Sequence, residues 1–216
     1  MRTVRWLASG LALIALTPSA GHAQEGRLFR DSWFWGVNAG VMNISSQTVS
    51  NQTATTVSGE WFITRTRGGL YLSAGESFFT INGTVNDNLG NPYNVQIKDM
   101  TQVMVDAIAL PVAWGGLHLY AGGGFILNLV HSATVTDTIL NPNVKQQVTQ
   151  NLNNQKDCIC FNILAGLHYQ MKRAAIFGNI IWMPTPYNFV LSGNSAWMLQ
   201  GGIRFNFGPS DESNLK

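Results

Sequence analysis

This sequence of 216 residues has few charged residues and only two cysteines. Only 11% of its residues are Asp, Glu, Lys or Arg, whereas soluble domains carry about 25%, so an ordinary cytosolic surface is excluded. Plentiful apolar residues and a small net charge exclude a disordered chain. No apolar run of about 18 residues follows residue 23, which argues against a helical membrane protein. Low charge, a mean hydropathy of only +0.05 and 22 glycines therefore require another class of fold.

The N-terminal segment has the three parts of a secretory signal peptide. Arg2 and Arg5 give the positive start, residues 6–16 form an apolar stretch, and residues 21–23 offer a small-residue cleavage site. A single membrane anchor is the alternative, but the apolar stretch is too short to span a bilayer comfortably. We therefore expect residues 1–23 to be removed from an exported protein.

Cleavage of this leader also changes the charge balance. Two of the 13 basic residues and none of the 11 acidic residues lie in the leader, so the mature chain carries 11 of each and no net charge. Without a basic patch, a nucleic-acid partner is not expected.

The two cysteines, Cys158 and Cys160, are separated by a single residue. In an exported protein they form either a disulfide or a pair of small residues near a strand end. Same-face neighbours on a straight strand place their Cα atoms near the upper limit for a bridge, which favours the second interpretation. A metal site is not expected, because the usual four-ligand spacing is missing.

Eight segments alternate between apolar and small or polar residues, which is typical of β-strands. In the sixth, Ile159 and Phe161 share one face while Asn162 lies on the other. Glu76 shares a face with apolar neighbours, which predicts a bulge near residues 74–75 or an error in the register. The expected strands are residues 33–42, 57–66, 70–81, 101–112, 117–131, 158–170, 174–183 and 197–207.

The connections between these strands alternate in length. The short turns are residues 67–69, 113–116 and 171–173, and the long polar connections are residues 43–56, 82–96, 132–156 and 184–194. In an up-and-down meander, all short turns then lie at one end. Transmembrane β-barrels have this asymmetry, an even strand number and aromatic girdles, and about ten tilted residues per strand cross the bilayer.

The fold class that follows is all-β: an eight-stranded antiparallel up-and-down transmembrane β-barrel over residues 24–207, with a short polar periplasmic tail at residues 208–216. Alternation alone fits an inverted barrel as well, with an apolar interior around a ligand, as in a soluble lipocalin-like binder. The one-sided loop asymmetry and the small residues on the polar face favour the membrane version.

Five ionisable residues are candidates for the interior of this barrel. Glu60, Asp106 and Arg204 share the inward parity, and His118 and His168 lie near the short-turn end. A buried charge must be paired or hydrated, so we hypothesise a polar network across the lumen, with separately hydrated side chains as the alternative. Eight strands leave an interior that side chains just fill, so a wide pore is not expected.

The last expected strand resembles the C-terminal β-signal of outer-membrane proteins. It carries Gln200 and Gly202, followed by the alternating aromatics Phe205 and Phe207. Residues 119–125 also resemble the aromatic–glycine strand of small outer-membrane barrels of the OmpA, OmpX and OmpW kind. The resemblance implies a place in the bacterial outer membrane, contact with its lipid, and insertion by the barrel-assembly machinery.

The leading functional hypothesis is a non-enzymatic outer-membrane protein with a filled or narrow polar lumen and long surface loops, in a structural or surface-interaction role. The connection at residues 132–156 would meet a surface partner. It is either a projecting hairpin, with Val144 and Val148 on a returning strand, or a disordered loop.

Two further hypotheses are a narrow channel for small or apolar solutes, as in OmpW-like proteins, and a lipid A-modifying enzyme. The enzyme is disfavoured because His131 and Ser132, the only adjacent His/Ser pair, would point to opposite faces of a strand. We therefore expect no catalytic residue, no metal and no cofactor.

Overall fold

The computed structural model describes residues 29–44, 52–184, 189–191 and 195–209, and the expected leader and most of the expected tail lie outside these ranges. Each strand pairs antiparallel with the next and β8 pairs with β1, which closes the barrel. The predicted eight-stranded antiparallel barrel is confirmed. The elements are β1 (Ser32–Ile44), β2 (Gln52–Thr64), β3 (Gly68–Asn86), β4 (Pro92–Trp114), β5 (Leu117–Val135), α1 (Pro142–Gln155), β6 (Asp157–Met171), β7 (Ala174–Met183) and β8 (Ala196–Pro209).

The two faces of the strands differ because successive side chains point to opposite sides. Along β6, Ile159 and Phe161 are exposed on the outside, whereas Cys160 and Asn162 are buried in the lumen. The outward face is an apolar band with exposed aromatic side chains toward both ends of the strands. These are Trp33, Trp35, Trp114, Tyr169, Phe205 and Phe207 at one end and Trp182 and Trp197 at the other.

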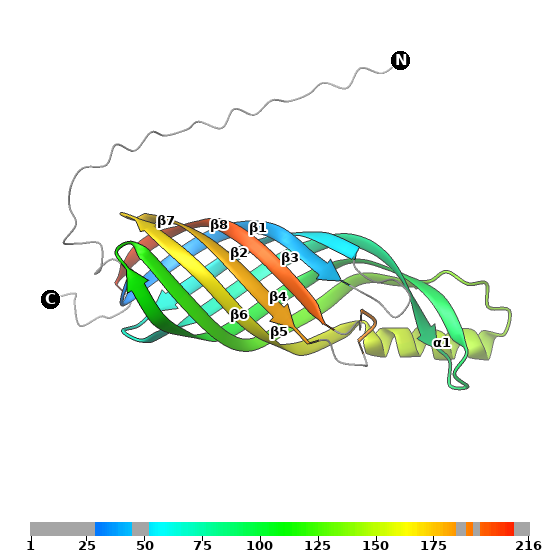
Figure 1. Ribbon diagram of the computed structural model, residues 1–216. Coiled ribbons are helices and arrows are strands. Elements are labelled where there is room, and N and C mark those ends of the chain that lie inside the picture. The colour runs from blue at the N-terminus through cyan, green and yellow to red at the C-terminus, as the bar shows by residue number, and fades with distance from the viewer. Residues whose placement is uncertain (1–28, 45–51, 185–188, 192–194, 210–216) are drawn as a thin grey trace, which may run out of the picture.

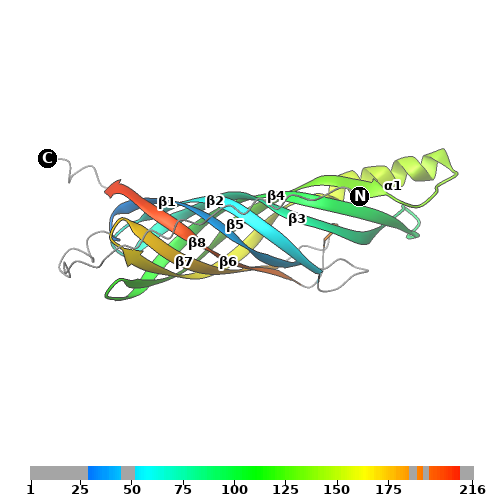
Figure 2. The same cartoon turned by 90° about the horizontal axis from the view of Figure 1, so that it is seen from above.

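The two ends of the barrel are built differently (Figures 1 and 2). At the short-turn end, residues 65–67, 115–116 and 172–173 join consecutive strands, and there β1 begins and β8 ends. At the opposite end β3, β4 and β5 continue beyond the other strands as a three-stranded sheet, which we call the extension. Helix α1 lies along this extension (Figure 1).

The long polar connection expected at residues 82–96 was wrong. β3 runs to Asn86 and β4 starts at Pro92, which leaves a turn of residues 87–91. The outward residues here are polar, but the inward ones keep the apolar half of the alternation and are buried beneath α1. These inward residues are Ile81, Val85, Val95 and Ile97.

The connection between β5 and β6 contains a helix, so both the returning strand and the disordered loop were wrong. The Asn141 side chain accepts a hydrogen bond of 3.0 Å from the backbone N–H of Asn143, and proline follows Asn141, a favoured start for a helix. Val148 and Leu152, four residues apart, form the buried face. The spacing between Val144 and Val148 fits a strand and a helix equally well. Among the described residues, no helix is long and apolar enough to cross a membrane.

The bulge expected near residues 74–75 was also wrong. β3 alternates regularly through Glu76, which therefore points outward. The irregularity in the pairing of β3 with β4 lies closer to the extension, between Ser77 and Thr80. It is opposite Asp99, which has a φ of 48° in the left-handed region. Polar side chains thus occur on the outward face of the barrel as well as inside it.

Candidate functional site in the barrel lumen

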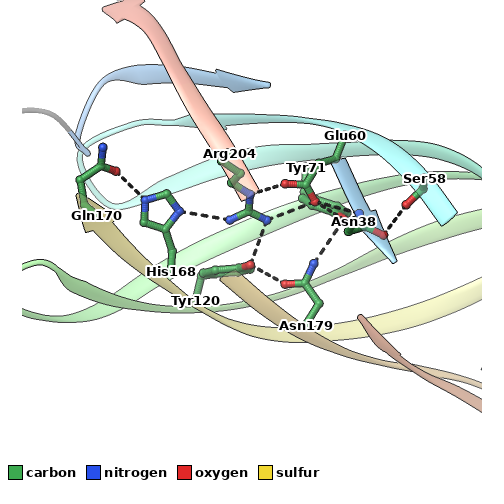
Figure 3. Close-up of polar contacts among 9 residues, drawn as sticks. All are labelled: Asn38, Ser58, Glu60, Tyr71, Tyr120, His168, Gln170, Asn179 and Arg204. Atoms are coloured by element: carbon green, nitrogen blue, oxygen red, sulfur yellow. Dashed lines mark hydrogen bonds and ion pairs between the residues drawn. The ribbon is translucent and has the colours of Figure 1, made fainter. Parts of the chain in front are cut away.

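A buried arginine lies at the centre of the lumen (Figure 3). Arg204 on β8 is fully buried, and its Nε forms an ion pair with Glu60 Oε1. Its Nη2 donates to the Tyr120 hydroxyl at 3.0 Å, and its Nη1 lies 3.3 Å from His168 Nδ1. The guanidinium carbon is 3.8 Å from the centroid of the Phe177 ring, which is a cation–π contact.

Hydrogen bonds around this ion pair close into a ring. From Arg204, the ring passes through Tyr120, which donates to Asn179 Oδ1, and through Asn179 Nδ2, which lies 3.3 Å from the Tyr71 hydroxyl. Tyr71 donates to Glu60 Oε2 at 2.8 Å, and Glu60 returns to Arg204. We call these five residues, drawn from β2, β3, β5, β7 and β8, the lumen ring. It supplies the extra hydrogen bonds that a buried ion pair requires.

The five ionisable residues expected in the interior separate into three groups. Glu60, Arg204 and His168 come together in one network. Asp106 lies outside it and accepts a hydrogen bond of 2.8 Å from Asn162 Nδ2. The ring of His118 stacks on Phe29 with centroids 3.8 Å apart.

Sequence reasoning missed three members of the lumen ring. Tyr71, Tyr120 and Asn179 lie on the inward parity of their strands, which was the available signal. Parity does not show that their polar atoms meet, because that depends on the register around the whole barrel. The hydrogen bonds of the lumen ring therefore become apparent only in the folded barrel.

The cysteines are joined in the structure. Cys158 and Cys160 form a disulfide with a Cα–Cα separation of 5.9 Å, inside the usual range. The structure thus differs from the favoured interpretation of two unpaired small residues. Asn128 Nδ2 lies 3.4 Å from Cys158 Sγ, so the disulfide is part of the packing inside the barrel, toward the end opposite the short turns.

A second polar cluster lies on the outward face. Thr101 Oγ1 is 2.7 Å from Glu76 Oε1 and 2.6 Å from His131 Nε2, and this nitrogen is 3.3 Å from Glu76 Oε2. A nucleophile relay needs the acid on the opposite ring nitrogen from the nucleophile, whereas here both groups contact Nε2.

Among the described residues, no group of three or more His, Cys, Asp or Glu is placed to hold a metal ion.

The tip of the extension is held by two carboxylates. Asp87 accepts hydrogen bonds of 2.9 Å from the side chain and backbone of Asn91 and from the backbone of Leu89, and these bonds lower its pKa. Asp137 accepts from the backbone and side chain of Asn94 at 2.7 and 3.0 Å, which likewise lowers its pKa. The hydrogen bonds to both carboxylates fix the turn and tie β4 to the chain after β5.

No family model and no curated protein matches this sequence. Among solved structures, Neisserial surface protein A is similar with a TM-score of 0.54 and 13% identity over 81% of this chain and 97% of that chain. The outer membrane protein OprG from Pseudomonas aeruginosa is similar with a TM-score of 0.51 and 11% identity, over 82% and 97%. This chain has the fold of the small outer-membrane barrels. The resemblance inferred from the last strand and the aromatic–glycine segment is confirmed at the level of the fold.

In this eight-stranded barrel, aromatic rings close the lumen at the short-turn end. Phe29, just before β1, has its ring centroid 5.9 Å from that of Phe34 and 6.1 Å from that of Phe62. The rings of His118 and His168 complete the cluster. These side chains are buried, so they close the lumen between the lumen ring and the short-turn end.

Apolar side chains close the other end of the lumen. Met42, Met100 and Met183 are buried with Phe189 and Leu191, which precede β8. A cavity of about 10 Å³ remains among them, which is near the minimum for a single water molecule. The described interior is therefore filled at both ends and at its centre.

Proposed function

We propose that this chain is a non-enzymatic protein of the bacterial outer membrane with a closed lumen and a structural or surface-interaction role. The observation that carries the proposal is the lumen ring, which joins side chains from opposite walls of the barrel. The buried side chains that close the lumen on either side of the ring support the same conclusion. The outward apolar band and its aromatic ends match the surface that lipid requires.

The fold also suggests an orientation. Outer-membrane barrels place their short turns in the periplasm and their long loops outside the cell, so the extension and α1 would project from the cell surface. In this proposal Gln200, Gly202, Phe205 and Phe207 form the signal for the barrel-assembly machinery. Phe205 and Phe207 point outward and are exposed on β8, where such a signal is accessible.

The extension is the candidate element for surface interaction. Its inner face is covered by α1, which buries Val148 and Leu152, and hydrogen bonds to Asp87 and Asp137 hold its tip. A partner that meets residues 132–156 would therefore contact an ordered surface, and such interfaces lose little conformational entropy on binding.

An epitope inserted after Leu140 should bind its antibody on intact cells. Leu140 is 92% exposed and lies between β5 and α1, so an insertion there leaves the barrel unchanged. The same epitope inserted after Lys172, in a turn at the short-turn end, should bind only after the outer membrane is permeabilised. Flow cytometry measures both. Equal binding to the two variants on intact cells, or binding to the Lys172 variant alone, would contradict the proposed orientation.

A narrow channel for small or apolar solutes is the second candidate. It is favoured by the apolar part of the lumen away from the short turns, where Met42, Met100 and Met183 line one small cavity. Passage would require these side chains and Phe189 to move aside. Uptake of an apolar solute by a deletion strain, with and without this chain restored, separates the candidates: a closed barrel restores no uptake, whereas a channel does.

A further inference from the structure

The extension presents a polar sheet surface on its outward side. The register places side chains in two rows across β3, β4 and β5, with Lys98 paired to its neighbours in one row and Gln96 in the next. The residues between the rows face inward and pack into the apolar core. We call the six outward residues the polar outer face: Thr80, Lys98 and Ser132 in the first row, and Asn82, Gln96 and Thr134 in the second.

The polar outer face continues the apolar band directly. On the same three strands and the same side, Phe78, Val103 and Leu129 are 51%, 38% and 38% exposed. The cluster of Glu76, Thr101 and His131 lies at this border. A lipid whose acyl chains rest on the apolar band therefore places its headgroup against the polar outer face, because the same strands continue past the irregularity between Ser77 and Thr80.

The chemistry of the polar outer face fits a particular headgroup. Hydroxyl and amide side chains offer both donors and acceptors, as the hydroxyls of a sugar do. Lys98 is its one charged residue, and no described residue forms an ion pair with it. An ammonium group binds phosphate through charge-assisted hydrogen bonds. The face has none of the aromatic side chains that are enriched in protein–protein interfaces.

We propose that the polar outer face binds the phosphorylated sugar headgroup of an outer-leaflet glycolipid. Lys98 contacts a phosphate, and Gln96 and Thr134 contact sugar hydroxyls in the neighbouring row. This inference rests on the proposed place of the chain in the outer membrane. It gives the extension a lateral surface for lipid in addition to its exposed tip.

Native mass spectrometry of the folded full chain in detergent tests this site with three added lipids: bisphosphorylated lipid A, the same lipid without phosphates, and phosphatidylglycerol. The wild type should retain bisphosphorylated lipid A best. Lys98→Glu should weaken that binding about tenfold or more, the loss expected for one charge-assisted hydrogen bond. Lys145→Glu is the matched control, because Lys145 is exposed on α1 away from the polar outer face, and it should bind as the wild type does.

A second variant tests the sugar contacts separately. Gln96→Ala with Thr134→Ala should weaken binding of lipid A and leave binding of phosphatidylglycerol unchanged. Equal binding by Lys98→Glu and Lys145→Glu, or equal retention of lipid A and phosphatidylglycerol by the wild type, would overturn the glycolipid site alone. Failure of the epitope experiment on cells would instead overturn the proposed location.

Discussion

Arg204→Met is expected to lower the free energy of unfolding by about 3–5 kcal/mol, because it leaves Glu60 as a buried charge without its partner. Both side chains are fully buried. The substitution also removes the donors to Tyr120 and His168, so neighbouring polar groups lose hydrogen bonds as well. Urea unfolding in lipid vesicles, followed by tryptophan fluorescence, measures the change.

Two further variants make this result specific. Arg173→Met removes the same charge from an exposed position between β6 and β7, where a change within about 0.5 kcal/mol is expected. Glu60→Gln combined with Arg204→Met should recover much of the lost stability, because no unpaired charge remains in the lumen. A loss for Arg204→Met no greater than that for Arg173→Met would show that the ion pair does not hold the barrel together.

Gly166→Ala is expected to destabilise the barrel by about 1–3 kcal/mol, as overpacking of a core does, or to block its assembly. A Cβ atom at Gly166 would lie 2.4 Å from Tyr120 Cζ and 2.5 Å from Asn179 Oδ1. Both residues belong to the lumen ring, so a methyl group there forces ring members apart. Heat-modifiable gel migration reports assembly, and urea unfolding reports the loss of stability.

Gly178→Ala is the matched control on the neighbouring strand. Its nearest atom, Gln200 O, would lie 3.7 Å from the new Cβ, which is an ordinary contact. The control variant should assemble as the wild type does. If the two alanine variants behave alike, close packing of β6 against the lumen ring is not what requires glycine at residue 166.

Alternation and turn lengths predict most of this fold. In a closed barrel the side chains of each strand point alternately outward and inward. An alternation of apolar and polar residues therefore appears in the sequence wherever one of the two faces is apolar. The extension was missed because its outward face is polar. Asn82 and Asn86 are typical of loops, and the apolar half of the alternation that remained beyond Ile81, such as Val85 and Val95, was too sparse to indicate strands.

Helix α1 was missed for a different reason. Its segment is rich in Asn and Gln, which are not distinctive of a helix, and its valines are spaced by four. The starting signal of Asn141 followed by proline was present in the sequence. Most helical stability comes from packing an amphipathic face, and the surface that receives Val148 and Leu152 exists only after β3, β4 and β5 have paired.

Sequence analysis predicted two members of the lumen ring, Glu60 and Arg204, but neither the other three members nor their arrangement. Parity placed Glu60, Arg204 and Asp106 inside, but parity gives the face of a strand and not the height along the barrel. Height depends on the register of all eight pairs, and this register brings Arg204 to Glu60 while it leaves Asp106 with Asn162. The same register brings Tyr71 and Asn179 within hydrogen-bonding distance.

Planar lipid bilayer recording of the folded wild-type protein tests the closed lumen most directly. The preparation is first shown to be folded by heat-modifiable migration. With the lumen ring at the centre and side chains packed at both ends, the protein should produce no stable steps in conductance. Stable, large steps from the folded wild type would contradict a closed lumen and favour a channel.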